Sequence, residues 1–181
     1  MRNVLFITNG HGEDLVAAEL IKQFPSNFDI KVLPLIGEGK AFDSLNVSIL
    51  GERKKLASGG FSLRNWSYFW RDIMGGLLRQ TATQMKLLRS LSDQVDLTVA
   101  VGDLVPMIAA LLVKSPWIFV GVNKSAYYKS FGSNYSPWER WLLQRARKVF
   151  VRDKVTENDL HQGLFKVQRA EYVGNPLMDG I

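Results

Sequence analysis

Hydrophobic positions in this chain follow two alternating periods. Short apolar, β-branched runs such as residues 4–7 and 96–101 precede segments with helical spacing such as 15–21 and 104–113. Strands that alternate with helices predict parallel strands joined by right-handed crossovers. We therefore expect an α/β fold: a Rossmann-like open, mostly parallel sheet with helices on both faces.

The alternation continues along the chain, apart from a polar, glycine-containing connection at residues 51–65. Residues 136–139 form a typical helix start with a capping box. Ser136 is the N-cap, Pro137 the first helical residue, and Glu139 follows three residues after the serine. Beyond the elements named above, strands are expected at residues 28–34, 47–50, 117–122, 148–151 and 170–173, and helices at 66–91, 137–146 and 154–162.

Length and composition narrow the function classes. A chain of 181 residues is expected to form a single domain over 1–181. No apolar run reaches the about 20 residues of a membrane span, and no cleavable signal is evident, so we expect a cytoplasmic protein. The chain has no cysteine and only two histidines, His11 and His161, so no metal site is expected. A net charge of +6 favours an acidic partner.

The segment after the first strand is the first candidate site, because ligands of open α/β sheets bind beyond the carboxyl ends of the strands. It lacks the Gly-x-Gly-x-x-Gly pattern, so no dinucleotide cofactor is expected. Gly10 and Gly12 would let the backbone approach a ligand. His11 is either an acid, base or donor, or an idle turn residue. Glu13 and Asp14 favour a helix start, where the dipole stabilises negative charge.

Asp103 is the second candidate. It follows the buried strand 96–101 and Gly102, at the edge of the sheet where ligands bind. A carboxylate there can act as a general base. It can also be the N-cap of the helix 104–113. The two roles are compatible, because one oxygen can cap while the other faces a cleft.

Aromatic and basic residues concentrate in two further segments. In 64–79, apolar residues at helical spacing alternate with arginines, which is typical either of a membrane-surface helix or of a core-facing stripe. The proposed membrane-docking residues are Arg64, Trp66, Phe69, Trp70, Arg71 and Ile73. A second mixture of bases and aromatics at 124–140 could stack nucleobases, but no nucleic-acid-binding module is present, so no nucleic acid is expected.

Taken in order, the glycine loop, the aromatic helix and the segments 95–103 and 173–179 resemble the N-terminal half of lipid-A-disaccharide synthase and its related proteins. More broadly, they are similar to GT-B glycosyltransferases. The resemblance implies that Asp103 is the general base and that Asp14 matches an aspartate of the family. His11 departs from the family pattern, and so does the segment 123–128, so the same acceptor is not implied.

In that family, a C-terminal domain binds most of the nucleotide-diphosphate sugar, and the resemblance implies that residues 1–181 correspond to the other domain alone. The resemblance therefore implies the acceptor-side half of a glycosyltransferase, acting on a lipid-linked or phosphorylated acceptor at the inner face of an anionic membrane. Two alternatives are a non-catalytic docking subunit of a split glycosyltransferase and half of a sugar-nucleotide epimerase. The residues expected to contact substrate are Gly10, Gly12, Glu13, Asp14, Gly102, Asn123 and Lys124.

Overall fold

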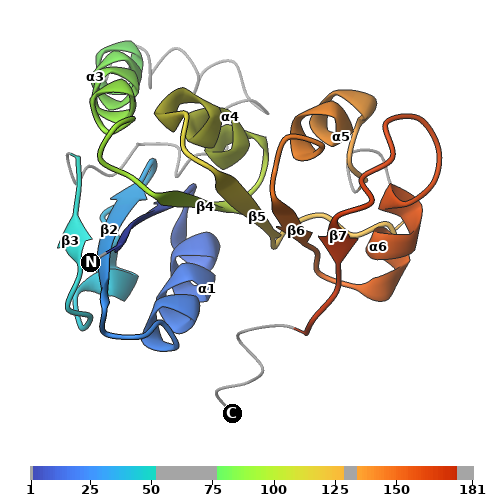
Figure 1. The fold of residues 1–181 in the computed structure, drawn as a ribbon, viewed down its shortest axis with the longest axis horizontal. Coiled ribbons are helices and arrows are strands. Elements are labelled where there is room, and N and C mark those ends of the chain that lie inside the picture. The colour runs from blue at the N-terminus through green and yellow to red at the C-terminus, as the bar shows by residue number, and fades with distance from the viewer. Residues whose placement is uncertain (1, 52–76, 129–133, 175–181) are drawn as a thin grey trace.

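A computed structural model describes residues 2–51, 77–128 and 134–174 (Figure 1). Seven strands form one sheet in the order β3-β2-β1-β4-β5-β6-β7, and every neighbouring pair is parallel. The strands are β1 (Arg2–Thr8), β2 (Phe28–Pro34), β3 (Ser48–Ile49), β4 (Leu97–Gly102), β5 (Trp117–Gly121), β6 (Lys148–Phe150) and β7 (Ala170–Glu171). The expected Rossmann-like parallel sheet is confirmed.

Helices cover both faces of the sheet, as expected. The helices are α1 (His11–Lys22), the 3-10 turn η1 (Lys40–Phe42), α3 (Leu77–Ser90), α4 (Leu104–Val113), α5 (Pro137–Leu143) and α6 (Lys154–Leu160). In Figure 1, α3, α4 and α5 lie on one face, and α1 lies on the opposite face. Helix α6 packs beside β7 at the sheet edge.

Two apolar layers result from the alternation of side chains along each strand. In β1, Leu5 and Ile7 belong to the buried cluster beneath α3, α4 and α5. Val4 and Phe6 belong to the cluster beneath α1. Each such side chain contributes about 1.5–3 kcal/mol when fully buried. The central strands are therefore buried on both faces, and their polar residues concentrate at the strand ends.

The start of α1 differs from the prediction. The helix begins at His11, whereas the apolar spacing indicated a helix from Leu15. The backbone N–H of Asp14 donates to the carbonyl of Gly10 at 2.8 Å and closes a helical turn there. Glu13 and Asp14 lie in this first turn, so their predicted place at the helix start is confirmed. The apolar spacing marks only the later part of the helix, whose side chains face the core.

Other element boundaries agree with the sequence to within a few residues. Strand β3 is shorter than the predicted 47–50. Helix α3 occupies the second part of the predicted helix 66–91, and the first part lies outside the described residues. The capping box is confirmed: Glu139 N donates to Ser136 Oγ at 3.3 Å, and Ser136 N donates to Glu139 Oε2 at 2.9 Å.

Candidate functional site

The site lies where the strand order reverses, between β1 and β4. Helix α1 leaves β1 on one face of the sheet, and α4 leaves β4 on the other. The two chains depart to opposite faces at the carboxyl ends of these strands, which is where open α/β sheets bind ligands. The residues that follow β1, β4 and β5 meet at this edge.

Asp103 is held by Asn9 across this reversal point. Asn9 Nδ2 donates to both carboxylate oxygens of Asp103, at 3.1 and 3.2 Å. Asp103 Oδ1 also accepts from the backbone N–H of Val105 at 3.0 Å, so the predicted N-cap of α4 is confirmed. The described residues provide Oδ2 with no second donor. One oxygen caps the helix while the other has lone pairs to offer a ligand.

Asn9 is a site residue that the sequence analysis did not single out. Its side-chain oxygen Oδ1 is buried and has no hydrogen-bond partner among the described residues. Its place in the sequence could have identified it, because Asn9 directly follows β1 just as Asp103 directly follows β4. Parallel pairing of these two strands places residues at their ends side by side.

A second amide–carboxylate pair lies beside the first. Asn123, which follows β5, donates from Nδ2 to Glu13 Oε1 at 2.5 Å. Glu13 is buried, with 8% of its surface exposed, and its side chain packs against Gly102. These two predicted substrate contacts, Glu13 and Asn123, are therefore brought together next to Asp103.

Gly102 gives a direct stability prediction. Its φ of +127° is unfavourable for other residues, and an added Cβ would lie 2.8 Å from Glu13 Cγ. We expect Gly102→Ala to lower the free energy of unfolding by about 1–3 kcal/mol. Urea unfolding measures the change.

Gly12 is the matched control for that substitution. It is exposed in the first turn of α1, and an added Cβ would meet nothing within 4 Å. Gly12→Ala should leave stability unchanged or raise it by up to about 1 kcal/mol, because alanine has the higher helix propensity. Equal stability of the two variants would contradict the predicted contact between Gly102 and Glu13.

The other predicted residues of the first segment take different places. His11 is the first residue of α1, directly after the N-cap Gly10. Asp14 is 1% exposed, and its Oδ1 accepts from the Thr8 hydroxyl at 2.5 Å. Asp14 thus joins the end of β1 to α1 inside the protein, where its side chain is shielded from solvent.

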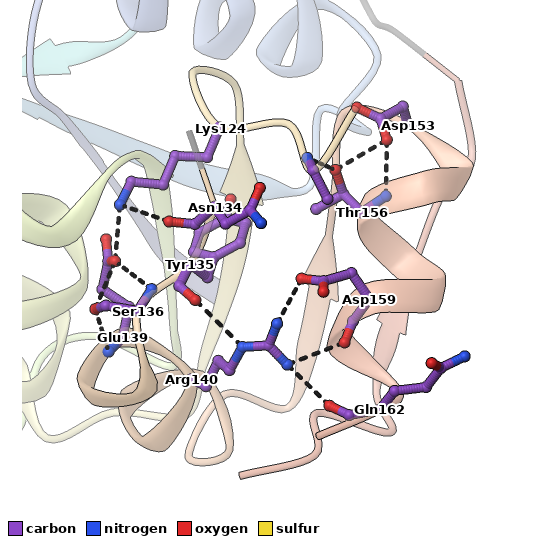
Figure 2. Close-up of polar contacts among 11 residues, drawn as sticks. Lys124, Asn134, Tyr135, Ser136, Glu139, Arg140, Asp153, Thr156, Asp159 and Gln162 are labelled. Atoms are coloured by element: carbon purple, nitrogen blue, oxygen red, sulfur yellow. Dashed lines mark hydrogen bonds and ion pairs between the residues drawn. The ribbon is translucent and has the colours of Figure 1, made fainter. Parts of the chain in front are cut away.

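Lys124 is engaged by the start of α5 (Figure 2). Its Nζ lies 2.7 Å from Glu139 Oε2 and donates to the backbone oxygen of Asn134 at 3.3 Å. It also lies 5.7 Å from the centre of the buried Tyr135 ring. The side chains of the Lys124–Glu139 pair are only 20% and 5% exposed. This cation therefore neutralises a buried carboxylate and anchors the segment after β5.

Helix α6 holds the same segment from its other side. Ala126 N donates to the hydroxyl of Thr156 at 2.9 Å. Thr156 in turn donates to Asp153, the N-cap of α6 (Figure 2). Although partial burial acts to raise it, the pKa of Asp153 lies below its ordinary value because Ser125 and Thr156 donate to the carboxylate. The backbone that carries Asn123 is therefore fixed at several points.

The proposed membrane-docking residues of 64–73 lie outside the described residues, so that assignment stays a prediction. Within the described ranges, no group of three or more histidine or acidic side chains is arranged to hold a metal ion. None of the described helices is long and apolar enough to cross a membrane.

Fold and site together define a Rossmann-like α/β domain with a carboxylate site at the reversal point of its parallel sheet. The crystal structure of UDP-N-acetylglucosamine 2-epimerase is similar to this chain, with a TM-score of 0.56 and 14% sequence identity. The match covers 96% of this chain and 48% of that one, so the chain spans about half the length of that structure. At this identity the likeness concerns the fold alone.

No protein-family model matches the chain, and no curated protein matches its sequence.

Proposed function

We propose that this chain is the acceptor-side half of a GT-B glycosyltransferase. The enzyme would move a sugar from a nucleotide-diphosphate sugar to a lipid-linked or phosphorylated acceptor. The observation that carries the proposal is the Asp103 carboxylate, oriented by Asn9 at the reversal point of a parallel sheet. The fold of the chain also matches about half of a UDP-N-acetylglucosamine 2-epimerase structure, which supports the placement of this domain as one half of a larger enzyme.

Each side chain has a defined part in this reaction. Asp103 Oδ2 accepts the proton of the acceptor hydroxyl as that oxygen attacks the anomeric carbon. The bond from the anomeric carbon to the diphosphate breaks, and the nucleoside diphosphate leaves with the electron pair. Asn9 is a positioning residue that orients the carboxylate. Glu13 and Asn123 bind the sugar ring beside it.

The remaining parts of the proposal concern groups beyond this site. The second half of the enzyme supplies most of the contacts to the nucleotide-diphosphate sugar. The segment 64–73 docks on an anionic membrane, and the enzyme is peripheral at its inner face. His11 and the backbone at Gly10 and Gly12 assist as auxiliary groups at the site.

Half of a sugar-nucleotide epimerase is the second candidate, because the similar solved structure is a UDP-N-acetylglucosamine 2-epimerase. The two reactions differ in the bonds they break. Inversion at a carbon that carries hydrogen breaks a C–H bond, and without a hydride-carrying cofactor the new hydrogen comes from solvent. Glycosyl transfer leaves every C–H bond of the sugar intact.

One experiment separates the two candidates. The complete two-domain protein is incubated in deuterated water with nucleotide-diphosphate sugars, with and without a lipid-phosphate sugar acceptor. We expect nucleoside diphosphate to be released only when acceptor is present, with no deuterium in the sugar by mass spectrometry. Deuterium incorporation without acceptor would establish the epimerase instead.

A further inference from the structure

An apolar cleft of about 410 Å³ lies next to the carboxylate site, on the face of the sheet that carries α1. Helix α1 packs against β1 and β4, and beyond it the cleft is lined by side chains of α1, β5, β6 and the segment after β7. We call it the α1–β6 cleft. Its apolar walls include Val16, Leu20, Val122, Phe150 and Val173. Its size and lining are typical of a small-molecule site.

The polar groups of this cleft lie at its edge. Asn123 lines it and also donates to Glu13, so this residue links the cleft to the carboxylate site. Arg152 follows β6, is exposed, and forms no ion pair with any described residue. The neighbouring carboxylate of Asp153 accepts hydrogen bonds from Thr156, and the charge of Arg152 helps to keep the pKa of Asp153 below its ordinary value without an ion pair between them. The cleft thus has apolar walls and one cationic side chain, Arg152, at its edge.

The order of the strands fixes the order of these polar residues along the edge of the sheet. Arg152, Asn123 and Asp103 follow the adjacent strands β6, β5 and β4. Neighbouring strands are about 4.8 Å apart, so two strand spacings separate the backbones of Arg152 and Asp103 by roughly 10 Å. That distance suits a phosphate followed by one sugar ring. The hydrocarbon chain attached to the phosphate would then enter the apolar cleft.

We propose that the α1–β6 cleft binds the hydrocarbon chain of a lipid-linked substrate, with Arg152 binding its phosphate. This assignment rests on the proposed function and narrows its acceptor to a sugar carried on a lipid phosphate. Charge complementarity supports it: the only charged side chain that lines the cleft in the described part of the chain is a cation, and the protein carries a net charge of +6.

Calorimetric titration of the 181-residue chain tests this proposal. The probes are decyl phosphate below its micelle-forming concentration, the neutral amphiphile decyl maltoside, and inorganic phosphate. We expect decyl phosphate to bind more tightly than either of the other two. Arg152→Gln should weaken its binding about tenfold, which corresponds to about 1.4 kcal/mol. Arg89→Gln, at an exposed arginine in the last turn of α3, is the matched control and should change nothing.

Filling the cleft is the second arm of the test. Val122→Trp should abolish binding of decyl phosphate, whereas Leu164→Trp should not, because Leu164 is 69% exposed and lies outside the cleft. Thermal melts verify that each variant is folded. If Val122→Trp does not fold, Leu20→Asn is the replacement and should weaken binding in the same direction.

Several results would overturn the assignment. The first two are equal affinity for decyl maltoside and decyl phosphate, and unchanged binding of decyl phosphate by Arg152→Gln. The others are binding of the protein to anionic vesicles but not to decyl phosphate, and loss of decyl phosphate binding in a longer protein because another segment fills the cleft. The titration needs no sugar donor, so its outcome is separate from that of the transfer experiment. If decyl phosphate binds as expected but no sugar is transferred, the proposed function fails and the lipid-phosphate site stands.

Discussion

Replacing Asp103 with asparagine is expected to lower the turnover of the complete enzyme by about 10²–10⁴-fold, the usual contribution of a general base. The free energy of unfolding should stay nearly unchanged, because asparagine is as good an N-cap as aspartate. The contact with Asn9 also survives. Rotation of the Asn9 side-chain amide lets its Oδ1, which has no described partner, accept from the new amide group.

Asp153→Asn is the matched control for this prediction. Asp153 is also an aspartate N-cap at the carboxyl end of a parallel strand, with Oδ1 accepting from Thr156 N at 2.7 Å. Turnover should persist in that variant, because its carboxylate is occupied by α6. Turnover and urea unfolding are measured on both variants. Full activity of Asp103→Asn would reduce Asp103 to a helix cap and remove the main support for the proposed reaction.

Replacing Arg140 with methionine is expected to have the largest effect on stability, lowering the free energy of unfolding by about 3–5 kcal/mol. The Arg140 guanidinium donates to the backbone oxygens of Tyr135 at 3.2 Å and of Asp159 and Gln162 at 2.9 Å each (Figure 2). It also pairs with the Asp159 carboxylate. Its side chain is only 11% exposed.

Methionine fills much of the same volume but leaves these acceptors without a donor. The melting temperature should fall by roughly 6–20 °C, since 1 kcal/mol corresponds to about 2–4 °C in a protein of this size. The loss of stability should reach the candidate site as well, because Arg140 joins α5 to α6. Helix α5 holds Lys124 through Glu139, and α6 holds Ala126.

Arg145→Met, two turns after the start of α5, is the comparison for this variant. Arg145 is exposed, stacks 3.4 Å above the Trp141 ring and donates to the Trp141 backbone oxygen at 2.6 Å. An exposed cation–π contact contributes about 0.5–1 kcal/mol. If thermal melts show equal losses for the two variants, Arg140 is not the buried junction described above.

Features carried by short sequence segments could be predicted. The capping box at Ser136 and the N-cap roles of Asp103 and Asp153 depend on residues within one helical turn of each other, so local sequence determines them. The strand β4 is apolar along its length because both of its faces are buried. The parallel sheet followed from the alternation of such strands with helices.

The site residues illustrate what local patterns miss. Lys124 and Asn123 are neighbours in sequence, yet Lys124 pairs with Glu139 on α5 while Asn123 reaches Glu13 on α1. Nothing within a short window distinguishes these two partners. Asn9 was missed for the same reason, since its partner Asp103 lies 94 residues away.

The sequence by itself therefore determined the class of fold, the helix caps and the position of Asp103 at a strand end, because short-range spacing and burial control each of these. Only the tertiary structure decided which polar side chains meet at that edge. Strand order in the sheet brings the ends of β1, β4 and β5 together, and that order depends on how the helices pack over both faces. The lining of the α1–β6 cleft was likewise set by contacts between α1 and residues more than a hundred positions later in the chain.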